Sequence, residues 1–195
     1  YIQGDETLHE NDYENILNAV KLMEKRSGLE GPVFDYIHFY CNSNIVKRIR
    51  DSYRREVHLI RNTQCTVFCR EGQGFKAKNG KKLCYTLADA TVYHYGWARV
   101  KDVMKRKVQN MGKLYHGKDF SGGDNFDYAR IWGVREFKGS HPKYMAQWIE
   151  ENKNDIDVLS LKLDFRPTHI RNIISDFVED MTGYRVGEYK NYKLT

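Results

Sequence analysis

Aromatic, histidine and arginine side chains crowd into one short stretch of this chain, residues 93–99. They are Tyr93, His94, Tyr95, Trp97 and Arg99. The residues leading into this stretch are β-branched and aromatic, which predicts a strand, and Gly96 then allows a sharp change of direction. Ligands of α/β proteins usually bind where strands end, so the stretch is a candidate binding site. The alternative interpretation is that these aromatic residues form the edge of a hydrophobic core.

Two carboxylates near the start of the chain, Asp5 and Glu6, could do complementary chemistry. Carboxylates suit a hard divalent cation such as Mg²⁺ or Mn²⁺, and a histidine can join them on Mn²⁺. A metal held in this way typically binds the phosphates of a nucleotide. Because Asp5 and His94 both lie at the ends of predicted strands, we expect them to converge on one site. In the alternative, His94 bonds a backbone carbonyl in the core and Asp5 caps a turn.

A strongly basic segment follows the aromatic stretch. Apolar residues recur at helical spacing from Val100 to Tyr115, which predicts a helix. Its cationic side chains could neutralise a diphosphate leaving group, although most of them fit a solvated helix face equally well. Arg99 differs because it lies at the turn itself. The cations are Arg99, Lys101, Lys105, Arg106 and Lys107.

The elements that must position these side chains can be predicted from periodicity. Helices are expected at 13–23, after 139–142 and at 166–181, and a short basic helix at 45–53. Strands are expected at 33–40, 56–61, 66–70, 83–87 and 91–95. The fold class is therefore α/β, a mixed sheet flanked by helices. The expected core comprises Ile16, Leu17, Val20, Phe34, Val57, Leu59, Val92, Val103, Met104, Trp148, Ile173 and Phe177.

Length and composition favour a single globular domain: the chain has 195 residues, 41% hydrophobic and 30% charged. The net charge of +6 favours anionic partners. The sequence has no apolar run as long as a membrane span and no signal peptide, so a cytoplasmic location is expected. The cysteines form no Cys-x-x-Cys pair, which favours reduced thiols over a zinc site. They are Cys41, Cys65, Cys69 and Cys84.

Several of these motifs resemble a known family. The run Gln3-Gly4-Asp5-Glu6 resembles the carboxylate motif of family 2 glycosyltransferases with the GT-A fold, usually Asp-x-Asp and often continued by Glu. Gln3 stands in the place of the first aspartate. Residues 92–99, with Met104 and Lys107, resemble the downstream pattern of a bacterial subgroup, as do residues 139–142 and 187–192. The likeness covers nearly the whole chain.

This resemblance implies a partial GT-A fold, the acceptor-side part of a longer transferase whose nucleotide-binding half normally precedes the motif. It implies transfer of a sugar from a nucleotide-sugar donor to a hydroxyl of a saccharide or lipid-linked acceptor, metal-assisted (Mn²⁺ or Mg²⁺) and inverting. Such an enzyme would work in the cytoplasm or at the inner membrane surface. The implied roles are metal binding by Asp5 and His94, donor diphosphate binding by His94, Arg99 and Lys107, acceptor binding by Tyr95 and Trp97, and base catalysis by Glu71, with Asp89 as second choice.

Two other function classes stay open at this stage. Because Gln3 replaces an aspartate, the chain could be a non-catalytic module that binds a sugar or a nucleotide. Its basic and aromatic residues could also bind nucleic acid. Against nucleic acid, the aromatic residues are not spread along one sheet face, and the acidic start would repel a polyanion. Glu71 could equally be a turn carboxylate paired with Arg70 or Lys76.

Overall fold

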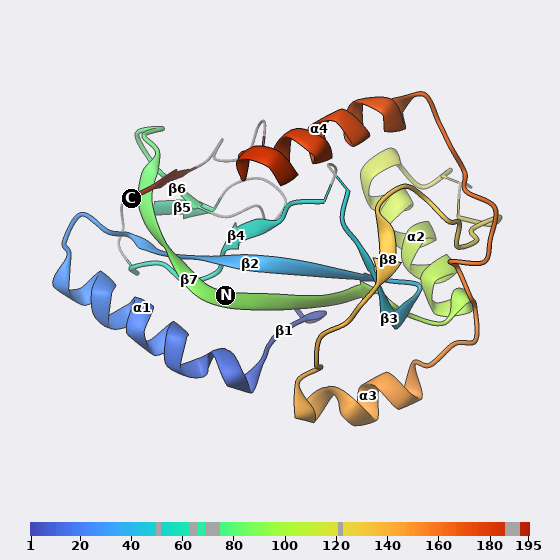
Figure 1. Cartoon of the computed structure of the whole chain (residues 1–195), viewed down its shortest axis with the longest axis horizontal. Helices are drawn as coiled ribbons and strands as arrows, with labels where there is room; N and C mark the ends of the chain where they lie inside the picture. The colour runs from blue at the N-terminus through green and yellow to red at the C-terminus, as the bar shows by residue number, and fades with distance from the viewer. Residues whose placement is uncertain (50–51, 63–65, 69–74, 121–122, 186–191) are drawn as a thin grey trace.

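A mixed sheet of seven strands forms the centre of the protein in this computed structural model, which describes residues 1–49, 52–62, 66–68, 75–120, 123–185 and 192–195 (Figure 1). The sheet is open and flanked by helices, so the predicted α/β class is confirmed. Its main order is β1 (Glu6–Leu8), β7 (Leu83–Trp97), β2 (Gly31–Tyr40), β3 (Asn42–Lys47) and β8 (Val134–Glu136). In addition, β4 (Arg55–Val57) pairs with β2, β9 (Tyr192–Leu194) pairs with β7, and β5 (Thr66–Phe68) pairs with β6 (Phe75–Ala77) in a separate ribbon.

The two long strands β2 and β7 run parallel and set the register of the site. His38 of β2 lies opposite His94 of β7, and Glu6 of the antiparallel β1 lies opposite His94 from the other side. The two strands expected at 83–87 and 91–95 are one strand, because Asp89 takes a positive φ of 50° and bends β7 without ending it. Aspartate tolerates this left-handed conformation better than most residues do.

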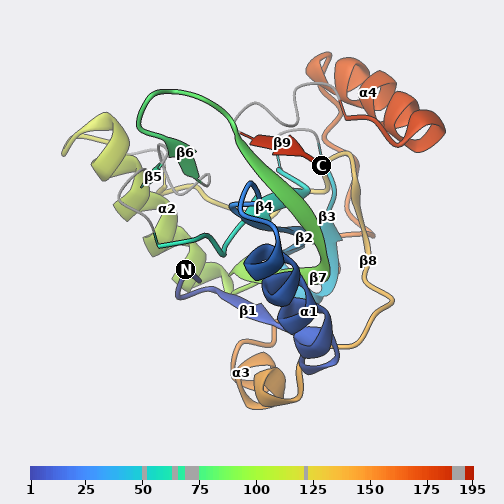
Figure 2. The same ribbon diagram turned by 90° about the vertical axis from the view of Figure 1, so that its left-hand side faces the viewer.

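The helices occupy both sides of the sheet. In Figure 1, α1 and α3 lie below the sheet and α4 above it, and in Figure 2 α2 lies to the left of the long strands β2 and β7. No helix of the described residues is long and apolar enough to span a membrane. The bounds are α1 (Tyr13–Lys25), α2 (Lys101–His116), α3 (Ala146–Glu151) and α4 (Thr168–Thr182), with short 3₁₀ helices η1 (Glu10–Asp12) and η3 (Lys143–Met145).

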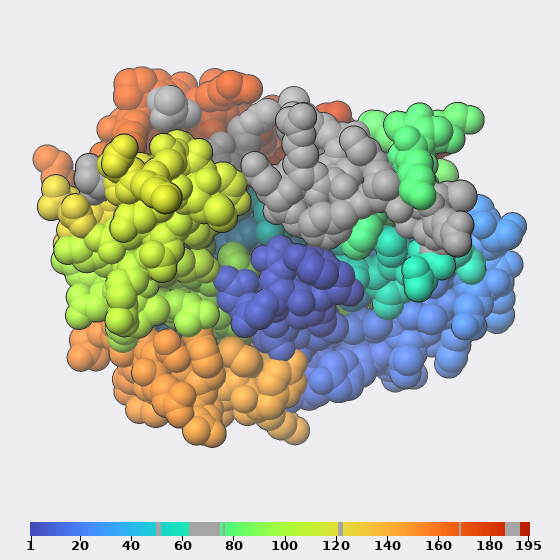
Figure 3. All heavy atoms as spheres, turned by 180° about the vertical axis from the view of Figure 1, so that it is seen from behind, coloured from blue at the N-terminus to red at the C-terminus, as the bar shows by residue number. Residues whose placement is uncertain are grey.

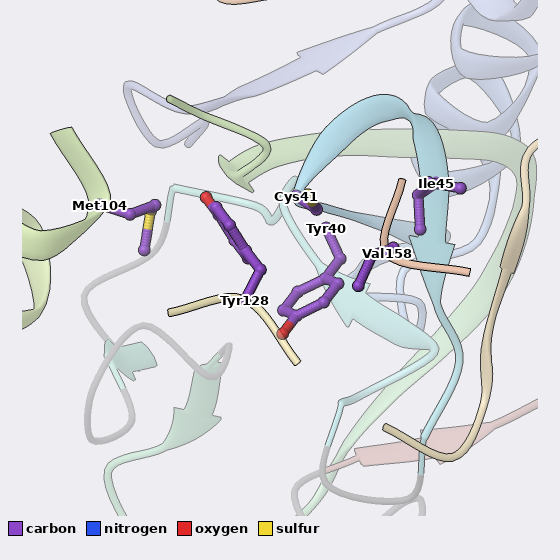
Figure 4. Close-up of a cluster of buried hydrophobic side chains, with 6 residues drawn as sticks. All are labelled: Tyr40, Cys41, Ile45, Met104, Tyr128 and Val158. Carbon is purple, nitrogen blue, oxygen red and sulfur yellow. The ribbon is translucent and has the colours of Figure 1, made fainter. Parts of the chain in front are cut away.

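The helix predicted at 45–53 is wrong, because its first residues belong to β3. Ile45 and Val46 are buried there, and β3 pairs with both β2 and β8. These β-branched residues satisfy their backbone in two strand pairings, which outweighs the weak local preference for a helix. Figure 4 shows Ile45 in the cluster that joins β2 and β3 to α2. Its members are Tyr40, Cys41, Ile45, Met104, Tyr128 and Val158.

The predicted core is correct in the sheet and partly wrong in the helices. Phe34, Val57, Val92 and Met104 are buried, whereas Leu17 is exposed. Half-buried positions are Ile16, Val20, Leu59, Val103, Trp148 and Ile173.

The last helix, α4, turns its polar face inward, contrary to its predicted apolar stripe. Phe177 is 66% exposed, whereas Asn172, Ser175 and Glu179 are buried. The cause is electrostatic: Glu179 lies among three arginines that hold this face of the helix against the protein.

Candidate functional site

Three charged or titratable side chains from distant parts of the sequence meet where β1 and β7 come together. Lys107 Nζ donates a hydrogen bond to Asp5 Oδ2 at 2.9 Å, and His94 Nε2 lies 3.6 Å from the same oxygen. The Lys107 ammonium also donates to the carbonyl of Gly96 at 2.9 Å. We call these four residues the Asp5 site. The expected convergence of Asp5 and His94 is thus observed.

Local structure explains the convergence. Because β1 runs antiparallel to β7 with Glu6 opposite His94, Asp5 falls at the end of this pairing, where its carbonyl accepts a hydrogen bond from the Tyr95 amide at 2.8 Å. Helix α2 begins just after β7 and returns Lys107 to the strand end. In Figure 3 the first residues (dark blue) lie beside α2 (yellow-green), and the surface is hollowed between them.

The Asp5 carboxyl is held in its ionised form. Its hydrogen bond with His94, supported by Lys107, lowers the pKa of Asp5 far below its usual range, although burial opposes this. The side chain stays partly accessible, with 20% of its surface exposed. A fixed and partly accessible anion can serve as a cation ligand.

A histidine chain extends the site into the sheet. His38 Nε2 lies 2.8 Å from the carbonyl oxygen of Tyr53 and must donate to it, so the neutral ring of His38 accepts at Nδ1. Burial lowers the pKa of His38 to about 3, which keeps this ring neutral. The donor to His38 Nδ1 is therefore His94 Nδ1, 3.2 Å away. This arrangement leaves His94 Nε2 facing Asp5 Oδ2 at 3.6 Å.

The donor set fits a divalent cation. Two ligands that each lie about 2.1 Å from one Mg²⁺ can be up to about 4.2 Å apart, and His94 Nε2 and Asp5 Oδ2 are 3.6 Å apart. Gly96 keeps the adjoining space open, because a Cβ there would lie 2.4 Å from His94 Nε2 and 2.6 Å from Asp5 Oδ2. No third His, Cys, Asp or Glu of the described residues completes a protein-only metal site. Water and phosphate oxygens would supply the remaining ligands, as is common for Mg²⁺.

Replacing Gly96 with alanine is expected to weaken Mn²⁺ binding at least about tenfold, because the new methyl group would occupy the space beside both ligand atoms. Water-proton relaxation during a Mn²⁺ titration measures this affinity. Gly4→Ala is the matched control, since a Cβ at Gly4 meets nothing within 4 Å. Equal affinity for Mn²⁺ in Gly96→Ala and wild type would show that the cation does not bind here.

Glu6 serves the structure behind the site rather than its surface. Its side chain is fully buried and accepts hydrogen bonds from the Tyr36 hydroxyl and, at 2.8 Å, from the Gln3 amide. This anchoring fixes the turn that carries Asp5. A second buried carboxyl, Glu56 of β4, lies on the same side, and burial together with the charge of Glu6 raises the pKa of Glu56 to about 8.

Glu56→Gln is expected to raise the free energy of unfolding at pH 8 by about 4–5 kcal/mol, since folding raises the pKa of Glu56 from about 4.3 to about 8 and each pKa unit is worth about 1.4 kcal/mol. In the wild type, the raised pKa of Glu56 makes the folded state favour the protonated carboxyl. The stability that this contributes is fully present below the unfolded pKa of about 4.3 and is lost as the pH rises through the folded pKa of about 8. Urea unfolding at pH 4 and pH 8 measures the difference, which should vanish at pH 4. Exposed Glu24→Gln should change neither value. A Gln variant less stable than wild type at pH 8 would mean that Glu56 is ionised and paired.

Tyr95, predicted to bind an acceptor, is instead a core residue. It is 1% exposed, stacks on Phe39 with ring centroids 4.4 Å apart, and its hydroxyl bonds His141 Nδ1 at 2.8 Å. Neighbouring residues of a strand point to opposite faces, so Tyr95 and His94 cannot share one site. The motif at residues 139–142 has a packing role here: His141 binds Tyr95, and Ser140 Oγ lies 3.0 Å from His9 Nε2.

The remaining predicted residues lie apart from the Asp5 site or outside the described part of the chain. Arg99 places its guanidinium 5.3 Å from the ring centre of Trp148, and Lys47 lies 5.4 Å from that of Trp97. Asp89 is exposed and five residues from His94, about 16 Å along the strand. Glu71 lies outside the described residues.

Sequence reasoning missed His38 and Tyr53, which extend the Asp5 site into the sheet. His38 is one of only two polar side chains, with Asp35, in the otherwise apolar stretch 33–40, and this was the signal that could have found it. The parallel register that sets His38 opposite His94 was not available from the sequence.

Comparison of the chain with protein-family models, curated proteins and solved structures found no match. Functional inference therefore depends on the residues and their geometry.

Proposed function

We propose that this chain is the acceptor-side part of a GT-A glycosyltransferase, which transfers a sugar from a nucleotide-sugar to an acceptor hydroxyl with help from Mn²⁺ or Mg²⁺. One observation carries the proposal: Asp5 of the first motif and Lys107 of the second, 102 positions apart, form an ion pair beside His94. Two motifs that resemble one family in sequence thus meet at one point, as a shared donor diphosphate would require.

Each residue of the Asp5 site has a definite task in this reaction. Asp5 and His94 would hold the cation, which when bound acts as a Lewis acid on the diphosphate leaving group. Lys107 donates to Asp5 and to the Gly96 carbonyl and would turn its third hydrogen to a phosphate oxygen, neutralising charge as the bond to the sugar breaks. His38 keeps His94 in the tautomer that presents Nε2 to the cation. The base that an inverting transfer needs is assigned to Glu71 from the sequence alone.

The alternatives gain less support. Stacking of nucleic-acid bases needs accessible rings, but Tyr93 is 9% and Tyr95 is 1% exposed. A non-catalytic module that binds a nucleotide would use the same Asp5 site, and only turnover distinguishes it from an enzyme.

Titration of the chain with UDP and GDP, each with and without Mn²⁺, tests the proposal by calorimetry. Binding should require Mn²⁺, and inorganic pyrophosphate with Mn²⁺ should compete for the same site. A single-stranded oligonucleotide, tested in parallel over a range of salt concentrations, should not compete. Equal affinity for UDP or GDP with and without Mn²⁺, or competition by the oligonucleotide, would contradict the proposal.

A further inference from the structure

A groove runs along the edge of β2 that faces away from β7, between the segments where β4 and β3 pair with it. Its volume is about 790 Å³, within the range of about 300–1,000 Å³ typical of small-molecule sites. The β2 wall includes Tyr36 and His38, and the opposite wall comes from the segment 135–139 that includes the end of β8.

The groove is strongly cationic. Among its described lining residues, lysines and arginines outnumber carboxylates by seven to two. Arg48, Arg54 and Arg185 are held in place by the buried Glu179 behind the wall, and Arg55 pairs with Asp35. Glu179 reduces the positive excess without cancelling it. The cations are Lys47, Arg48, Arg54, Arg55, Arg135, Lys138 and Arg185.

Two of these cations, Arg135 and Lys138, stand on the wall opposite β2. Both are exposed and make no ion pair with a described residue. A guanidinium presents a planar fork of donors that matches phosphate and carboxylate oxygens. Because neither side chain has to break an ion pair with a described residue first, both can bind an anionic ligand.

Aromatic rings and a link to the Asp5 site complete the groove. Tyr53 and Phe137 are half-buried in its lining and can offer apolar surface to a sugar ring. His38 belongs to the lining and lies 3.2 Å from His94, which faces Asp5. The groove and the Asp5 site are thus separated by a single histidine pair.

We propose that this groove binds the acceptor, and that the acceptor is an anionic saccharide carrying a phosphate or a carboxylate. The acceptor role depends on the function proposed above, whereas the binding of a sugar anion does not. The arginine-rich walls hold the oxyanion, the aromatic rings contact the sugar, and the position beside His38 brings the ligand next to the donor diphosphate.

Binding of small probes to the whole chain tests this assignment by NMR titration. Glucose 6-phosphate and glucuronate distinguish a phosphate from a carboxylate acceptor, and at least one of them should bind about tenfold more tightly than glucose. Inorganic phosphate should bind more weakly than glucose 6-phosphate. The double variant Arg135→Gln/Lys138→Gln should lose about tenfold in affinity for the sugar anion. The control Lys25→Gln/Arg26→Gln removes the same charge at the exposed end of α1 and should not change binding.

Equal binding of the sugar anion to both double variants would overturn the groove assignment. Inorganic phosphate binding as tightly as glucose 6-phosphate would overturn the acceptor role. Mn²⁺-dependent UDP binding, measured on the same variants, separates the two proposals. If UDP binding persists while the affinity for the sugar anion is unchanged in Arg135→Gln/Lys138→Gln, only the groove assignment fails. If UDP binding is absent while sugar-anion binding depends on Arg135 and Lys138, the proposed transferase function fails and the anion site stands.

Discussion

Replacing Asp5 with asparagine is expected to abolish the Mn²⁺-dependent binding of a nucleoside diphosphate. Asparagine keeps the shape of the side chain but removes the charge that the cation and Lys107 both use. Mutation of residues behind a metal ligand costs roughly 10–100-fold in affinity, so loss of the carboxylate ligand should exceed this range. The Lys107 ammonium would also be left beside a neutral amide and His94.

Calorimetry with UDP and Mn²⁺ measures this loss, and water-proton relaxation follows Mn²⁺ alone. The matched control is Asp127→Asn. This variant breaks a second aspartate–lysine pair, in which Asp127 contacts Lys101 of α2 at 2.7 Å. This pair is largely exposed and is expected to leave binding unchanged. Wild-type affinity in Asp5→Asn would remove Asp5 from the metal site and, with it, the main support for the transferase proposal.

Much of the fold could be predicted because local pattern and tertiary packing agree. The helical spacing of apolar residues in α1 and α2 matches the observed helices, and the apolar run of β2 lies in the sheet centre. Prediction failed where long-range contacts decide. Ile45 and Val46 enter a strand only because β2 and β8 are available to pair with them.

The residues of the candidate site also separate into those that local motifs predict and those that depend on long-range contacts. Asp5, His94 and Lys107 could be predicted because two motifs carry them. Tyr95 was assigned to the site although the two-residue period of a strand turns it away from His94, so the sequence already held the physical reason against it. His38 needed the register between β2 and β7, which no local pattern encodes.

Glu179→Gln is expected to lower the free energy of unfolding by about 3–5 kcal/mol, the cost of removing one partner from a buried ion pair. The Glu179 side chain is 3% exposed, and its carboxylate lies 2.9 Å from both Arg48 and Arg54 and 3.5 Å from Arg185. Glutamine would keep the volume but remove the buried charge that Arg48, Arg54 and Arg185 share. Because this contact holds the polar face of α4 inward, the helix should detach before the sheet unfolds.

The pH dependence of this loss has a definite sign. Burial alone would raise the pKa of Glu179, but the hydrogen bond from Arg48 and the surrounding arginines lower it below its usual value. Because its pKa is lowered in the folded state, Glu179 contributes stability above the unfolded pKa of about 4.3, and this contribution is lost as the pH falls below that value. The free energies of unfolding of wild type and variant, measured in urea, should therefore differ more at pH 7 than near pH 3. Asp180→Asn is the matched control: Asp180 also faces Arg48, at 3.5 Å, but is 67% exposed and should cost less than about 1 kcal/mol. Equal losses for the two variants would mean that the arginines do not depend on Glu179, and the inward polar face of α4 would need another cause.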